Sequence, residues 1–208
     1  FLHTLPGTPF VYQGEEIGMT NVKLPSIEDY NDLDTRNTYQ QGLLSGMTPK
    51  EALSHAQLVS RDNARTPMQW DDSAQGGFTT AAPWLKVNPN TKEINVKAQR
   101  EDPFSIYQCY RNLIALRKKS PALTRGDMTF VETGCKELIA FTRSTPDETL
   151  LAIHNFSRQE HAIPDSLLKD AREALLSSYD REGGYKGPVL RAYESVIFRM
   201  KKSKTSRE

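Results

Sequence analysis

The residues best suited to chemistry lie at positions 60–70, where the chain reads SRDNARTPMQW. Two arginines, an aspartate, an asparagine and a tryptophan stand close together there. An arginine guanidinium donates fixed pairs of hydrogen bonds to hydroxyls and carboxylates, and an indole offers a flat apolar face with one polar edge. This composition suits a sugar pocket. A surface loop whose arginines only form salt bridges has the same composition, so its context must decide between the two.

A second segment, at positions 5–21, supplies that context. It reads LPGTPFVYQGEEIGMTN, which is a β-branched and aromatic run followed by a glycine and two carboxylates. This pattern predicts a buried strand within residues 7–19, with a polar end.

These two segments, together with VNPN at 87–90 and INV at 94–96, resemble the oligo-1,6-glucosidase branch of the α-amylase family, glycoside hydrolase family 13. The resemblance runs from about Leu5 to Met200. It implies a (β/α)₈ TIM barrel followed by a small β domain, with the segment at 7–19 as the last barrel strand. The expected fold class is therefore α/β followed by all-β, with an antiparallel β-sandwich after the end of the barrel.

The resemblance also implies where the reacting groups lie. In this family a nucleophilic aspartate, an acid/base glutamate and a third aspartate stand on the fourth, fifth and seventh barrel strands, which would precede Phe1. We therefore expect this chain to be a C-terminal fragment of a retaining, exo-acting α-glucosidase, with no catalytic residue of its own. Its expected partners are an α-glucosidic oligosaccharide and the upstream part of the barrel.

The periodicity of the chain changes near Pro121. Before it, Asp102 and Pro103 predict the start of a helix that ends at Ser120, and a capping box at 48–51 predicts another helix. After it, short alternating segments predict antiparallel strands around 128–130, 138–140, 150–154, 174–176 and 196–198. The predicted domains are 1–121, the end of the catalytic barrel with its substrate-binding loop, and 122–200, the β-sandwich, followed by a disordered tail at 201–208.

Arg61 matches the family's arginine that holds the terminal glucose at the non-reducing end, and its acidic partner is expected upstream. The alternative is an arginine that only braces its loop. Arg65 is a weaker candidate for sugar contact, because it could brace the loop through Asp62 or Asp71. Asp34 falls where relatives place a glutamate for the glucose beyond the cleavage point, but it could equally be a helix N-cap.

Glu15 and Glu16 do not form the carboxylate pair of a retaining glycosidase, because neighbours on an extended chain point to opposite faces. We expect them to bind loops at the barrel mouth, and Glu15 is kept as a substrate-binding candidate. The histidines, His3, His55, His154 and His161, show no spacing typical of metal ligands. The predicted site therefore contains no metal, and no cofactor is expected.

The 27 basic and 26 acidic side chains nearly balance, so nucleic acid and anionic membranes are not expected partners. Cys109 and Cys135 have neither disulfide nor metal-ligand spacing, which favours free thiols and a cytoplasmic protein. Two further functions stay open. One is a trehalose-6-phosphate hydrolase or sucrose isomerase of the same family. The other is a non-catalytic relative, such as the heavy subunit of an amino-acid exchanger, although that protein would not need the arginine fork.

Overall fold

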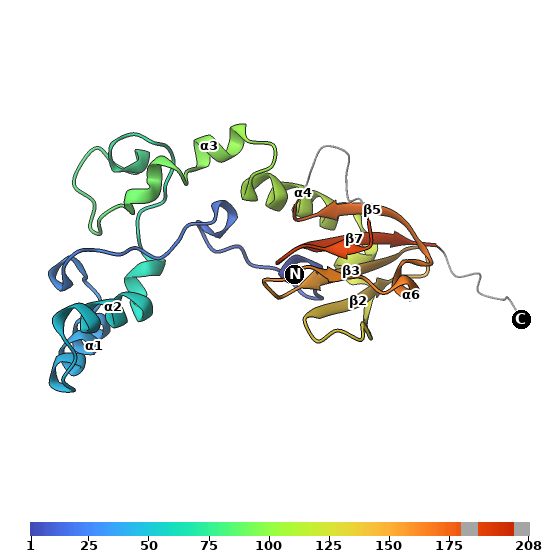
Figure 1. Cartoon of the computed structure of the whole chain (residues 1–208). Coiled ribbons are helices and arrows are strands. Elements are labelled where there is room, and N and C mark those ends of the chain that lie inside the picture. The colour runs from blue at the N-terminus through green and yellow to red at the C-terminus, as the bar shows by residue number, and fades with distance from the viewer. Residues whose placement is uncertain (180–186, 202–208) are drawn as a thin grey trace, which may run out of the picture. The chain divides into compact units, whose positions relative to one another are not determined.

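The computed structural model describes residues 1–179 and 187–201 and groups them into two compact units (Figure 1). The first unit combines Phe1–Phe10 with the chain from Gln108 onward, and the second is Val11–Tyr107. The boundary predicted near Pro121 falls inside the first unit and stays a prediction about how the complete fold is divided. The predicted disordered tail lies outside the described residues, apart from Lys201.

The Val11–Tyr107 unit is built from helices and long loops. Helix α1 (Leu33–Leu44) packs against α2 (Pro49–Val59), and α3 (Val96–Glu101) follows later in the chain. The capping box that predicted α2 is confirmed, since Glu51 N donates to Thr48 Oγ1 at 3.3 Å and Thr48 N donates to the Glu51 carboxylate at 2.9 Å. Gly42 lets the two helices approach closely, because a Cβ there would lie 3.0 Å from that of Ala52.

The strand predicted within residues 7–19 is not formed among the described residues. Phe10 is 86% exposed, and Glu15–Ile17 is a 3₁₀ turn flanked by Gly14 and Gly18, both at positive φ. A strand is stable only when a neighbouring strand takes up its backbone hydrogen bonds, and no described segment pairs with this one. Phe10, Val11 and Tyr12 are therefore exposed and belong to no sheet among the described residues.

Helix α4 spans Ile106–Lys119 and begins later than predicted. Asp102 ends α3 instead of starting α4, and its Oδ1 accepts a hydrogen bond from Phe104 N in a tight turn. The short helix α5 (Pro121–Arg125) follows directly after α4. No helix among the described residues is long and apolar enough to cross a membrane.

The unit that contains Gln108 onward is organised by a five-stranded antiparallel sheet in the order β1-β2-β3-β7-β5 (Figure 1). Its strands are β1 Asp127–Val131, β2 Leu138–Ser144, β3 Thr149–Asn155, β5 Ala171–Ser177 and β7 Ser195–Met200. A smaller ladder pairs β4 (His161–Ala162) with β6 (Val189–Leu190), and α6 (Asp165–Leu168) follows β4. Every strand predicted from the alternating pattern is confirmed.

Both faces of this sheet are covered. Leu151 and Ile153 of β3 join a cluster with Ile163 and Leu190, whereas Leu150 packs with Leu113 and other residues of α4 and α5. Because successive side chains of a strand point to opposite faces, β3 supplies both clusters and is buried along almost its whole length. This explains why its sequence reads as a continuous apolar run.

His154 is a buried titratable group in this sheet. Its Nδ1 lies 2.8 Å from Ser195 Oγ, its Nε2 lies 3.3 Å from Thr4 Oγ1, and the Phe1 ring stands edge-on to it at 5.1 Å. Burial is the main cause that lowers the pKa of His154 from 6.5 to about 3. The imidazole is therefore neutral in the folded protein under most conditions.

We expect this histidine to make the sheet unit less stable as the pH falls from about 6.5 to about 3. In that window the unfolded chain binds a proton at position 154 and the folded chain does not, so protonation favours unfolding by up to about 1.4 kcal/mol per pH unit. Urea denaturation of His154→Gln and of the exposed control His55→Gln across this range measures the effect. Equal pH slopes in both variants would contradict the assignment.

Candidate functional site

The segment at 60–70, called the arginine loop below, is anchored on a buried carboxylate that was not among the predicted site residues. Asp32, 4% exposed, is the N-cap of α1. Its Oδ1 accepts from Arg61 Nε at 2.9 Å and lies 2.8 Å from Arg61 Nη2, while its Oδ2 accepts from the backbone N and the hydroxyl of Thr35. Both carboxylate oxygens are thus fully used, and Arg61 is held in one orientation.

These contacts also set the charge of Asp32. Burial by itself raises the pKa of this carboxyl, but the hydrogen bonds from Arg61 and Thr35 outweigh burial and lower the pKa from 3.8 to about 2. Hydrogen bonding to Asp32 also raises the pKa of Arg61. The pair is therefore ionised at every physiological pH.

One nitrogen of the Arg61 guanidinium, Nη1, remains available for a further hydrogen bond. Its Nη2 forms a second ion pair with Asp34 Oδ2 at 2.9 Å, whereas its Nη1 has no hydrogen bond with the described residues. The side chain is 57% exposed. One edge of the guanidinium is fixed on carboxylates, and the Nη1 hydrogens are free to meet a hydroxyl or another acceptor.

Asp62 holds the loop to the start of α1 from the other side. This residue is 1% exposed, and its Oδ2 accepts from Asn31 N at 2.7 Å and from Asp32 N at 2.9 Å. Its Oδ1 forms no hydrogen bond and has Arg65 Nη1 at 3.5 Å. One carboxylate therefore fixes the backbone that carries Asp32, on which Arg61 depends.

The remaining predicted site residues have different surroundings. Arg65 braces the loop, because its Nη1 lies between Asp62 and Asp32 at 3.5 and 3.6 Å, and Asp71 takes no part. Asp34 is 70% exposed on its side chain and pairs with Arg61. The N-cap role considered for Asp34 belongs to Asp32 instead, because the helix begins at Leu33, two residues earlier than that role requires. Two acids that pair with Arg61, Asp32 and Asp34, thus lie in this chain, and the partner expected upstream stays a prediction.

Glu15 is not brought to this cluster. It lies in the 3₁₀ turn Glu15–Ile17, so the premise that Glu15 and Glu16 lie on an extended chain was wrong. The Glu16 carboxylate accepts from Gly14 N at 2.7 Å, which gives it the structural role that was expected. Glu15 lines a separate hollow of about 320 Å³, which Ser60, Asn63 and Thr66 of the arginine loop also line.

The motifs at 87–90 and 94–96 meet the end of the arginine loop. Gln69 Nε2 donates to Asn90 Oδ1 at 3.1 Å and to the backbone carbonyl of Ile94. The backbone carbonyl of Gln69 accepts from Val96 N at 2.9 Å. Asn88 Nδ2 in turn donates to the Thr20 carbonyl at 3.0 Å. Segments far apart in the sequence thus support one loop, and Trp70 beside them is 50% exposed.

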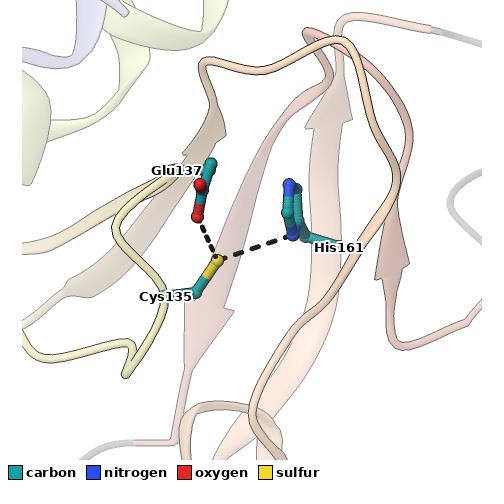
Figure 2. A group of neighbouring side chains, drawn as sticks. All are labelled: Cys135, Glu137 and His161. Carbon is teal, nitrogen blue, oxygen red and sulfur yellow. Dashed lines mark hydrogen bonds between the residues drawn. The ribbon is translucent and has the colours of Figure 1, made fainter.

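A second polar cluster lies in the sheet unit and was not predicted. Cys135, Glu137 and His161 place their ligand atoms within 4.8 Å of one another (Figure 2). The expectation that no histidine belongs to a group able to hold a metal was therefore wrong for His161. Sequence spacing could not reveal this group, because antiparallel pairing brings together residues far apart in the chain.

Comparison with known families agrees with the resemblance. The family described as "Alpha amylase, catalytic domain" matches residues 1–126, and "Alpha-amylase SusG C-terminal domain" matches residues 138–197. The oligo-1,6-glucosidase of Parageobacillus thermoglucosidasius is 43% identical over 97% of this chain and 37% of its own length. The trehalose-6-phosphate hydrolase of Bacillus subtilis (strain 168) is 39% identical over 97% of this chain and 36% of its own length.

Solved structures lead to the same family. The trehalulose synthase MutB from Pseudomonas mesoacidophila MX-45 matches with a TM-score of 0.82 and 40% identity, over 96% of this chain and 37% of that one. Variants of MutB are known in complex with glucose and with the substrate sucrose. This chain spans little more than a third of the length of these relatives. From the matched catalytic-domain sequence and the shared fold, the chain belongs to the α-amylase family of glycoside hydrolases.

Proposed function

We propose that this chain is the C-terminal portion of a retaining, exo-acting α-glucosidase of the oligo-1,6-glucosidase type, which hydrolyses short α-linked gluco-oligosaccharides. Similarity to oligo-1,6-glucosidases at 41–43% identity supports this activity. The observation that supports it best is the geometry of Arg61, whose guanidinium is fixed on buried Asp32 while its side chain is 57% exposed and its Nη1 forms no hydrogen bond with the described residues. Such a group can bind the hydroxyls of a terminal glucose without having to be ordered first.

Arg61 would close one end of the substrate cleft. Its Nη1 hydrogens donate to hydroxyls of the non-reducing glucose, and the Asp32 carboxylate prevents the guanidinium from turning away. Asp34, exposed beside it, would contact the sugar beyond the scissile bond. Arg65 and Asp62 would shape the loop, and Glu15 would lie at the border of the cleft.

The bond-breaking step would use carboxylates in the part of the protein that precedes this chain. A glutamic acid with a raised pKa would protonate the glycosidic oxygen while an aspartate attacks the anomeric carbon, and water would then release glucose with retention. In that scheme this chain contributes binding and orientation. Orientation matters for rate, because a misplacement of about 1 Å can cost on the order of a hundredfold.

Two relatives keep an alternative open within the same family. The trehalose-6-phosphate hydrolase of Bacillus subtilis and the trehalulose synthase MutB are nearly as similar to this chain as the oligo-1,6-glucosidases are. The alternative activities are therefore hydrolysis of trehalose 6-phosphate and isomerisation of sucrose. We place the enzyme in the cytoplasm, which the absence of a disulfide at Cys109 and at Cys135 supports.

The test is an assay of the complete protein, with isomaltose, maltose, trehalose 6-phosphate and sucrose as substrates. We expect release of glucose from isomaltose, with the α-anomer formed first as followed by NMR. The isolated 208-residue chain should release no nitrophenol from a nitrophenyl α-glucoside, because it would lack the reacting carboxylates.

Two results would contradict the proposal. A complete protein that converts only trehalose 6-phosphate or sucrose would assign one of the alternative activities instead. Turnover by the pure 208-residue chain would show that the reacting groups lie in the chain itself.

A further inference from the structure

The cluster of Cys135, Glu137 and His161 combines the three side-chain types that bind zinc most often (Figure 2). Cys135 and Glu137 lie in the loop between β1 and β2, and His161 opens β4. Figure 2 shows the thiol placed between the carboxylate and the imidazole, with all three side chains pointing toward one another. All three are half-buried, so solvent can reach them.

The distances match those around a metal ion. Cys135 Sγ lies 3.5 Å from His161 Nδ1 and 3.2 Å from Glu137 Oε2. Around a tetrahedral Zn²⁺ ion with Zn–S of about 2.3 Å and Zn–N of about 2.0–2.1 Å, a sulfur and a nitrogen ligand lie about 3.5 Å apart. The side chains would therefore need only small movements to surround the ion.

The contact with Ser157 holds the imidazole of His161 in an orientation that suits metal binding. Ser157 Oγ accepts from Gln159 N at 3.1 Å and lies 3.1 Å from the Gln159 carbonyl, to which it gives its one hydrogen. Its remaining lone pair faces His161 Nε2 at 2.9 Å and can accept from Nε2–H in the tautomer that carries the ring proton there. The lone pair of Nδ1 is then free and points at the cluster, as in zinc sites where an outer partner orients the histidine.

The thiol is also held in place by its loop. Cys135 N donates to Thr133 Oγ1 at 3.2 Å, and the Cys135 carbonyl accepts from Leu138 N at 3.1 Å. Gly134, which lies between Thr133 and Cys135, has a φ of 69°, a conformation that favours glycine. The cost of ordering the loop is therefore already met by folding, which leaves more of the metal–ligand energy for binding.

We propose that Cys135, Glu137 and His161 bind one Zn²⁺ ion through Sγ, a carboxylate oxygen and Nδ1, with water in the fourth position. Binding replaces the S–H bond of Cys135 by an S–Zn bond and releases the thiol proton to solvent. The ion would join the β1–β2 loop to β4 and so link the large sheet to the β4–β6 ladder. Nothing in this site depends on the proposed glycosidase activity.

The experiment titrates the metal-free 208-residue chain with Zn²⁺ alone in a calorimeter and with Co²⁺ alone in a spectrophotometer. We expect one Zn²⁺ per chain, release of about one proton, and the near-ultraviolet band of a thiolate bound to Co²⁺. Cys135→Ala should abolish the band and weaken Zn²⁺ binding more than about tenfold, while the matched control Cys109→Ala should keep both. Ser157→Ala should weaken binding by about 10–100-fold through loss of the oriented imidazole.

Circular dichroism and thermal melting without metal check that each variant folds. If Cys135→Ala does not fold, Glu137→Gln and Ser157→Ala still test the site, because both keep the sulfur and should weaken binding. Absence of saturable Zn²⁺ binding to the wild-type chain would overturn the proposal. A band lost in Cys109→Ala but kept in Cys135→Ala would overturn it as well.

Discussion

Replacement of Arg61 by alanine in the complete enzyme is expected to lower kcat/KM for short α-glucosides by roughly thirtyfold to several hundredfold. The variant loses the hydrogen bonds proposed to hold the terminal glucose. It also removes the counter-charge nearest to the carboxylate of Asp32, which is 4% exposed and then faces Arg65 Nη1 at 3.6 Å. The loss should appear with isomaltose and maltose alike, because both present the same non-reducing glucose.

Arg61→Lys should recover only part of this loss. An ammonium is a point charge and cannot donate to both Asp32 and a sugar hydroxyl with the geometry of the fork. Arg111→Ala is the matched control, since Arg111 is an exposed arginine on α4 and should leave kcat/KM unchanged. The proposed sugar contact would be contradicted if Arg61→Ala had unaltered kcat/KM on both sugars and an unchanged melting temperature. Arg61 would then only stabilise its loop.

The sheet unit could be predicted from sequence because its signals are local. Alternation of apolar and polar residues marks each strand, and the antiparallel partners of these strands all lie in the same chain. The capping box of α2 is local in the same sense. Such elements are specified by residues within a few positions of each other, and the structure agrees with them.

The strand predicted within residues 7–19 was wrong for the opposite reason, because its signal is not local. Its apolar run is typical of a strand, yet a strand requires backbone partners from elsewhere, and the described residues supply none. The apolar run is suited to a strand packed inside a barrel. Without neighbouring strands, these residues do not form one. The exposure of Phe10 fits the same explanation.

The candidate site was predicted in part. Arg61 pairs with Asp34 as well as with Asp32, and Asp32, which joins Arg61 to Arg65, was missed. A signal for Asp32 was present, because aspartate is one of the residues preferred at a helix N-cap. The roles of Asp62 and of the Cys135 cluster depend on contacts between distant segments, which spacing along the chain does not encode.

Asp62→Ala is expected to have the largest effect on stability in the Val11–Tyr107 unit. Asp62 Oδ2 is the acceptor for two backbone N–H groups, those of Asn31 and Asp32, at 2.7 and 2.9 Å. Alanine would leave both donors unsatisfied beside a side chain that is 1% exposed. Hydrogen bonds to a charged group contribute about 1.5–3 kcal/mol each, so the free energy of unfolding should fall by about 3–5 kcal/mol. Urea denaturation of the 208-residue chain measures this change.

Asp62→Asn is the matched control because both N–H groups meet the same oxygen. An amide oxygen at the position of Oδ2 has two lone pairs and can accept both hydrogen bonds. The variant then loses only the charge that faces Arg65 at 3.5 Å, whose side chain is 40% exposed, and should cost about 1–2 kcal/mol. In the complete enzyme Asp62→Ala should also lower kcat/KM, because the backbone that carries Asp32 would no longer hold Arg61 in place. Equal destabilisation by alanine and asparagine would mean that the charge of Asp62, and not its two backbone hydrogen bonds, stabilises the arginine loop.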